Sequence, residues 1–227
     1  MTMRTQIKVL RSLAHACLVL GGIFRGVGGH CDAAIIYAKA PDGGRPMVYA
    51  LASSILRTDP RFLGGFRIGE LTITDPCQKY YVDLTNLASG RLLSAANPGA
   101  WTYLFTHGTN AVGAAALIAD EKTGKAVESA GLYQTDFSLE ALRIAEQLPQ
   151  IRKQDYEFRR LESPPILFGA VWLHGKSDDI IIPLGLTFGR WNAYQPYSPR
   201  QMIKLLKPEA QKKLKEPAGY GRTGGKK

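Results

Sequence analysis

Two apolar runs near the carboxyl end constrain the fold of this chain more than any other feature. Residues 166–173 and 180–188 are almost entirely apolar, and the polar, glycine-containing segment 175–179 separates them. Runs of this length are typical of strands buried on both faces, and the segment between them has the composition of a turn. The sequence therefore predicts a β-hairpin in the core of a sheet. Pro183 has no amide hydrogen to donate, so the second arm is predicted to lie at an edge or to contain a bulge.

Two stretches upstream predict more of the same sheet. Residues 100–106 are rich in aromatic and β-branched side chains and follow a turn signal, which is typical of a strand. Residues 111–119 and 126–133 flank the polar segment 120–125, which contains a glycine. Two short apolar runs around such a segment predict a second β-hairpin.

One amphipathic helix is predicted to cover this sheet. Apolar residues recur between positions 137 and 151 at spacings of four, three, four and three, which places them on one face of a helix. Asp136 or Ser138 can cap its amino end by accepting hydrogen bonds from free amides. Pro149 lacks an amide hydrogen and clashes with the preceding turn. We therefore expect the helix to cover residues 138–147.

Shorter elements are predicted elsewhere in the chain. Residues 46–56 fit a short helix that begins with a proline, and residues 66–73 have the composition of a strand. Residues 80–87 fit either a strand or the start of a helix. Residues 198–206 predict a short helix in which Ser198 caps the amino end and a proline takes the first position.

These patterns together predict an α+β fold: a mainly antiparallel sheet of four to six strands covered by one principal helix, with basic tails. The predicted organisation has three parts. Residues 1–34 form a signal peptide or a disordered leader, residues 45–199 form a single α+β domain, and residues 200–227 form a short helix followed by a basic disordered tail.

The net charge of +10 comes from the two ends of the chain. Residues 12–199 carry equal numbers of basic and acidic side chains, so the body is neutral and its charge excludes no class of partner. Residues 1–11 are basic and residues 12–24 are mostly apolar, which is the layout of a secretory signal peptide. The sequence leaves two alternatives open, an amphipathic or poorly ordered leader and a native start at Met47. Export to the periplasm or the medium and a cytoplasmic location therefore both remain predictions.

The candidates for chemistry are few. His174 follows a strand and lies near Asp178 and Asp179 across the turn, which is the pairing a general base needs. Cys77, with His107 or His174, is the only candidate for a thiol nucleophile, and a buried structural cysteine is the alternative. Two adjacent aspartates are too few for a calcium site, which takes about six to eight oxygen ligands. No metal or cofactor is predicted.

Aromatic residues suggest binding rather than catalysis. They either belong to the core or form one face that binds a protein partner or a small ligand. The basic residues 207–227 offer a weaker route to nucleic acid or an anionic membrane. The predicted binding residues are Trp101, Tyr103, Tyr133, Trp172 and Trp191.

Three functions follow from these observations. The first is a non-enzymatic binding or accessory domain, exported or not. The second is a small hydrolase-like enzyme that uses His174 with Asp178 or Asp179. The third is a protein that docks on nucleic acid or ribosomes through its basic carboxyl-terminal tail.

Overall fold

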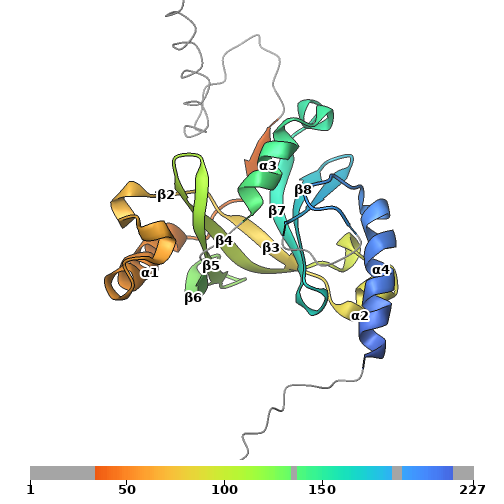
Figure 1. Ribbon diagram of the computed structural model, residues 1–227, viewed down its shortest axis with the longest axis horizontal. Coiled ribbons are helices and arrows are strands. Elements are labelled where there is room, and N and C mark those ends of the chain that lie inside the picture. Colours follow the sequence, from red (N-terminus) through yellow and green to blue (C-terminus); the bar gives the residue numbers. More distant parts are fainter. Residues whose placement is uncertain (1–33, 134–136, 186–190, 217–227) are drawn as a thin grey trace, which may run out of the picture. The chain divides into compact units, whose positions relative to one another are not determined.

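A nine-stranded mixed sheet dominates the described part of the chain (Figure 1). The computed structural model describes residues 34–133, 137–185 and 191–216. The strand order is β6-β5-β4-β3-β7-β8-β9; β1 pairs with β7 beside β3, and β2 pairs with β4. The strands are β1 Ile35–Tyr37, β2 Thr72–Ile73, β3 Cys77–Tyr81, β4 Asn97–His107, β5 Asn110–Ala119, β6 Ala126–Tyr133, β7 Tyr156–Ser163, β8 Phe168–Gly175 and β9 Asp179–Pro183.

Four α-helices and several short 3-10 turns accompany the sheet within the described residues. None of these helices is long and apolar enough to cross a membrane. The α-helices are α1 Gly44–Thr58, α2 Leu84–Ala88, α3 Ser138–Glu146 and α4 Pro199–Lys215; the 3-10 turns are η2 Phe62–Gly65, η3 Ile68–Glu70, η4 Leu93–Ala95, η5 Pro149–Arg152 and η6 Pro164–Ile166.

The register of the strands assigns every side chain to one of two faces, because residues directly opposite each other point the same way. Trp101, Gln78, Arg159, Trp172 and Ile181 lie opposite one another across β4, β3, β7, β8 and β9. We call their side of the sheet the α4 face. The other side is the α3 face.

The α3 face is covered by α3, which packs on β8 and β9. Ala141, Leu142 and Ala145 of this helix pack against the strands. Four of the five residues predicted to face the sheet belong to the same cluster, and the fifth, Ile144, does not; the four are Phe137, Ala141, Leu148 and Ile151. Ser138 does not act as an amino-terminal cap, because its hydroxyl instead accepts a hydrogen bond of 2.6 Å from Arg160. Asp136, the alternative cap, lies outside the described residues.

The α4 face is covered at its two ends by different helices. At one end α1 packs on β5 and β6, and Val48 and Ala52 are fully buried there. At the other end α4 packs on α2 and β9 and buries Met202, Leu206 and Ala210. None of the described α-helices has its main contacts on β3 or β7, so the middle of this face lies between the two covered ends.

The observed sheet corrects the predicted architecture. The α+β class and the dominance of antiparallel pairs are confirmed. The expected four to six strands under one principal helix are wrong, because the described residues alone form nine strands and four α-helices. The missing strands are short, and they pair with partners that are distant in sequence: β1 and β3 both pair in parallel with β7. Local periodicity carries no signal for such pairings.

The carboxyl-terminal helix is also longer than its predicted range of residues 198–206. Ser198 and Gln201 form a reciprocal capping box, and Pro199 takes the first turn, as expected. The helix then continues through Pro208 to Lys215. Residues 1–33 of the predicted leader and residues 217–227 of the predicted basic tail lie outside the described residues.

The β8–β9 hairpin has a tight turn that gives a first test of the fold. A Cβ atom on Gly175 would lie 2.6 Å from the Asp178 carbonyl oxygen and 2.7 Å from the ring of Tyr156, whereas one on Gly169 would meet only Leu184, at 3.8 Å. We expect Gly175→Ala to lower the free energy of unfolding by about 1–3 kcal/mol through overpacking. Gly169→Ala, in the same strand, is the control and should change it little. Urea denaturation measures both; equal effects would contradict the structure.

A buried tyrosine gives a second test. Burial, helped by Cys77 and Asp75, raises the pKa of Tyr37 from its ordinary value near 10 to about 12. The folded chain therefore keeps this proton at a pH where the unfolded chain releases it, so stability should fall between about pH 10 and pH 12. We expect that in Tyr37→Phe the free energy of unfolding falls by about 2–3 kcal/mol less over this pH range than in the unchanged chain. Tyr49→Phe, at a residue that is 50% exposed, is the control in urea titrations across this pH range.

Candidate functional site

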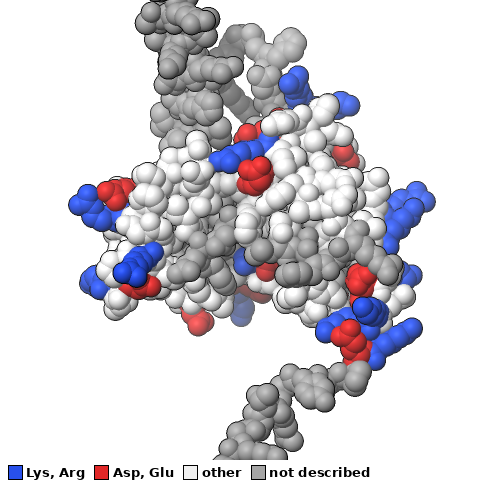
Figure 2. Space-filling model, viewed as in Figure 1, with Lys and Arg blue, Asp and Glu red and all other residues white. Residues whose placement is uncertain are grey.

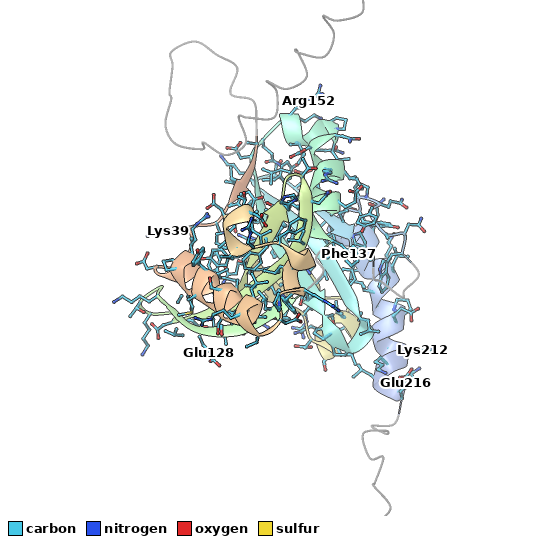
Figure 3. All side chains as sticks on the ribbon, turned by 60° about the vertical axis from the view of Figure 1, so that its left-hand side comes forward. Lys39, Glu128, Phe137, Arg152, Lys212 and Glu216 are labelled. Carbon is cyan, nitrogen blue, oxygen red and sulfur yellow. The ribbon has the colours of Figure 1, made fainter. Side chains whose placement is uncertain are left out.

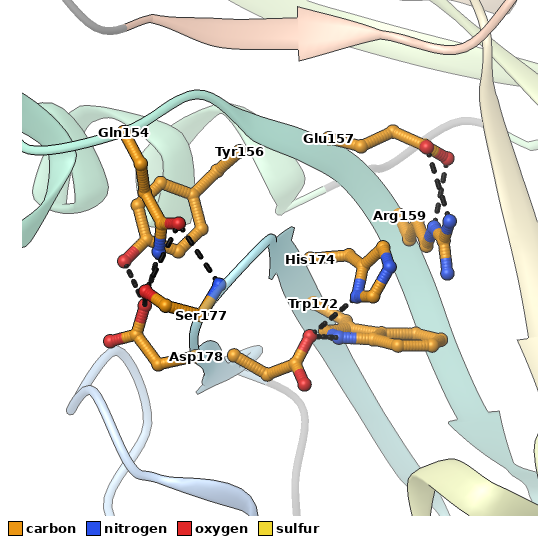
Figure 4. Close-up of polar contacts among 9 residues, drawn as sticks. Gln154, Tyr156, Glu157, Arg159, Trp172, His174, Ser177 and Asp178 are labelled. Carbon is orange, nitrogen blue, oxygen red and sulfur yellow. Dashed lines mark hydrogen bonds and ion pairs between the residues drawn. The ribbon is translucent and has the colours of Figure 1, made fainter.

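A strip of polar and aromatic side chains lies between the two covered ends of the α4 face. Two neighbouring cross-strand rows supply it: Glu157 lies opposite His174 and His174 opposite Asp179, while Arg159 lies opposite Trp172. Because strand side chains alternate, residues two apart on β7 and on β8 share this face. We call the following residues the polar strip: Tyr80, Glu157, Arg159, Trp172, His174 and Asp179. Figure 4 shows Glu157, Arg159, Trp172 and His174.

The Arg159 guanidinium is fixed on three sides. Its Nε lies 2.8 Å from Glu157 Oε1 and its Nη2 lies 3.1 Å from Glu157 Oε2, a two-pronged ion pair. Its Cζ lies 5.0 Å from the centre of the Tyr80 ring and 4.7 Å from that of Trp172. A cation between two aromatic rings gains from both ring quadrupoles. Burial raises the pKa of the Tyr80 hydroxyl, while the nearby Arg159 charge opposes that rise.

One carboxylate oxygen organises the other half of the strip. Asp179 Oδ1 accepts a hydrogen bond of 2.8 Å from Trp172 Nε1 and lies 2.7 Å from His174 Nδ1. An ionised carboxylate can only accept, so the hydrogen of a neutral His174 ring belongs on Nδ1. Nε2 then carries the free lone pair. The side chain of His174 is 41% exposed, so this nitrogen belongs to a ring that solvent reaches.

The two aspartates of the turn have different partners. Asp178 lies on the other side of the hairpin, where its carboxylate accepts a hydrogen bond of 2.6 Å from the Tyr156 hydroxyl and another from Gln154 (Figure 4). Burial and the Asp178 contact raise the pKa of Tyr156. Ser177 completes this group, because its amide and its hydroxyl each donate to Gln154 Oε1. Of the two candidates, the structure therefore pairs Asp179 with His174 and places Asp178 in the network that closes the turn.

Cys77 is not near either histidine proposed as its partner. It is 1% exposed and belongs to the α3 face, whereas His174 belongs to the α4 face. His107 lies at the far end of β4, where its ring stacks on Phe66 with 4.0 Å between the ring centres. The structure does not bring a cysteine–histidine pair together from these residues.

The predicted aromatic binding residues divide between two regions of the core. Trp101 and Tyr103 pack in the cluster under α1, and the fully buried Tyr103 hydroxyl has no hydrogen-bond partner among the described residues. Trp191 packs edge-on against Phe168 in the cluster under α4. Trp172 alone belongs to the polar strip. Tyr133 ends β6, and its side chain lies outside the described set.

Sequence reasoning missed Glu157, Arg159 and Tyr80. The pattern of β7 does contain a usable signal, because two opposite charges two residues apart on a strand must share a face. The register that sets Arg159 opposite Trp172 could not be read from the sequence.

Among the described residues, His, Cys, Asp and Glu form no group of three or more that is arranged to hold a metal ion.

The organising role of Asp179 can be tested directly. Asp179→Ala leaves the nearly buried Trp172 N–H without its acceptor, so we expect the free energy of unfolding to fall by about 1–3 kcal/mol. In nitrogen-15 NMR spectra, the neutral His174 ring should carry its hydrogen on Nδ1, and Asp179→Ala should remove that preference. Asp178→Ala should leave the His174 signals unchanged. If Asp178→Ala changed these signals and Asp179→Ala did not, the pairing of His174 with Asp179 would be wrong.

Comparison with known proteins gave no relative. No family model, no curated protein and no solved structure matches this chain. Its function has to be inferred from the chemistry of its own surfaces.

Proposed function

We propose that this chain is a non-enzymatic binding domain whose binding surface is the polar strip. Its ligand presents hydrogen-bond donors and a positive charge, as a lysine or arginine side chain of a peptide does. The proposal rests mainly on one observation: Asp179 holds Trp172 Nε1 and His174 Nδ1 at the same oxygen, which orients the acceptor nitrogen of a partly exposed ring. A fixed acceptor reduces the ordering entropy that binding costs.

The charges of the strip favour a cationic ligand. Glu157 and Asp179 supply two carboxylates, and Arg159 supplies one guanidinium that is already bound to Glu157. With a neutral His174 ring, the strip carries a net negative charge. The side chains of Glu157, Arg159, His174 and Asp179 are 16–41% exposed, so solvent only partly screens the attraction of the carboxylates for a cation.

An exposed apolar residue borders the strip. Ile36 on β1 lies opposite Glu157, and it is 45% exposed. Isolated exposed apolar residues are common, but this one lies beside a preorganised polar group. A lysine or arginine stem can lie along Ile36 while its charged end reaches the carboxylates.

The test uses arginine amide and lysine amide as probes, with glutamate amide as the comparison. We expect the two cationic amides to shift the His174 ring and Trp172 indole signals in NMR titrations, and glutamate amide to leave them in place. Glu157→Gln and His174→Ala should each weaken the cationic amides by about tenfold, which is the loss of one charge-assisted contact. His107→Ala, far from the strip, is the control. Equal shifts from all three amides would overturn the proposal.

A second candidate function is supported by the His174–Asp179 contact itself. A carboxylate that holds Nδ1 leaves Nε2 able to take a proton from water, the role of a general base. In that case a screen of ester, amide and phosphoester substrates should find an activity that His174→Ala abolishes without changing the melting temperature. Such a result would replace the binding proposal.

A further inference from the structure

A small notch lies away from the polar strip, between the η6 turn and the end of α4. It has a volume of about 160 Å³ and lies where β7 passes into β8. Figure 3 labels Lys212 on the last turns of α4 and Glu216 just after the helix; both residues line the notch. The residues that line it are Pro165, Ile166, Leu167, Trp191, Glu209, Lys212, Lys213 and Glu216.

Leu167 is held at the rim in a costly conformation. Its φ of +52° is in the left-handed region, which L-residues with a side chain rarely occupy. Its side chain gains little burial in return, because the residue is 62% exposed. Strain of this kind at an exposed apolar residue suggests that the side chain has a use outside the fold.

The indole of Trp191 adds an unsatisfied donor at the same place. Trp191 is 5% exposed, and its Nε1 has no hydrogen-bond partner among the described residues. A buried indole usually finds an acceptor, and leaving one out costs free energy. A bound segment whose backbone carbonyl reached Nε1 would relieve that cost.

The charge of the residues around the notch indicates the charge of its partner. α4 and its cap residue Glu216 carry six basic side chains and two acidic ones, whereas the described residues before α4 carry equal numbers of each. Figure 2 shows these basic groups along the edge of the molecule formed by α4. Glu216 is bound to Lys213 at 2.7 Å, and Lys212 makes no ion pair with a described residue. An acidic partner fits this surface best.

The size of the notch decides what enters it. Sites for drug-sized molecules usually measure about 300–1,000 Å³, well above this one. A cavity of about 150 Å³ holds a single benzene ring, so one large apolar side chain fits. We propose that the notch is the docking site for an acidic segment of a partner protein, which inserts one apolar side chain beside Leu167 and Trp191 and sets its carboxylates against the α4 lysines.

Two other occupants are less well matched. A bilayer surface is flat, so it would contact the rim but leave the concave part unfilled. Residues 217–227 follow α4 directly, but they contain three basic side chains and no acidic one, and like charges repel. Both remain outcomes of the test.

The experiment uses the full chain and a capped peptide in which one leucine is flanked on each side by two aspartates. Binding is followed through the indole Nε1–H signal of Trp191, assigned with Trp191→Phe. We expect the peptide to bind at least about tenfold more tightly than versions with serine for leucine or lysine for aspartate. Leu167→Asn should weaken binding by a similar factor without lowering the melting temperature, because asparagine tolerates positive φ. The double variant Lys212→Ala with Lys213→Ala should also weaken it, and Lys176→Ala should not.

Each alternative has its own signature. Equal affinity for all three peptides would overturn the proposal. The proposal would also be overturned if the peptide failed to bind while the protein was retained on phosphatidylserine–phosphatidylcholine vesicles or on a single-stranded oligonucleotide, and the double lysine variant abolished that retention. A shift of the Trp191 signal on deletion of residues 217–227, without peptide, would assign the notch to the chain's own tail. His174→Ala should leave peptide binding unchanged, so failure here is distinguishable from failure of the function proposed for the polar strip.

Discussion

The parallel pairing of β3 with β7 is the constraint on which the rest of the structure depends. On one side of this pair lie β4, β5 and β6, each joined to the next by a hairpin; on the other side lie β8 and β9. Among the described strands, no other pairing joins the two halves of the sheet. The pairing sets Tyr80 beside Arg159 on the α4 face, and without it the polar strip would lose one of its aromatic walls.

Charged side chains mark this junction on both faces of the sheet. On the α3 face, Glu162 lies 3.0 Å from Arg160 and 3.3 Å from Lys79, and all three side chains are at most 17% exposed. A shift of the register by one residue would move these charges to the opposite face of the sheet. Buried ion pairs give little net stability, but breaking one is costly. We interpret this group as a constraint that fixes the register of β3 against β7, with a role in specificity rather than in overall stability.

The sequence predicted what is local and missed what is not. The hairpins β5–β6 and β8–β9 and the helix α3 follow from apolar spacing and turn chemistry within short windows, and each was found near its observed place. Residues 80–87 fitted both a strand and a helix because β3 ends there and α2 begins. The arginines of β7 were hard to interpret because buried arginine is rare, and only the register shows what they contact. The choice between Asp178 and Asp179 depended in the same way on where the turn ended.

The polar strip and the notch use opposite ends of one strand. Leu167 immediately precedes β8 and His174 is its penultimate residue, a span of roughly 23 Å along an extended chain. Between them, Phe168 packs against Trp191, and Trp172 packs against Arg159, all on the α4 face. Met202 and Leu206 of α4 are buried in the cluster that contains both aromatic side chains of β8. The last turns of α4 therefore line the notch, while its buried side packs in the cluster that holds Trp172 of the polar strip. Both surfaces require α4 to be packed on the sheet.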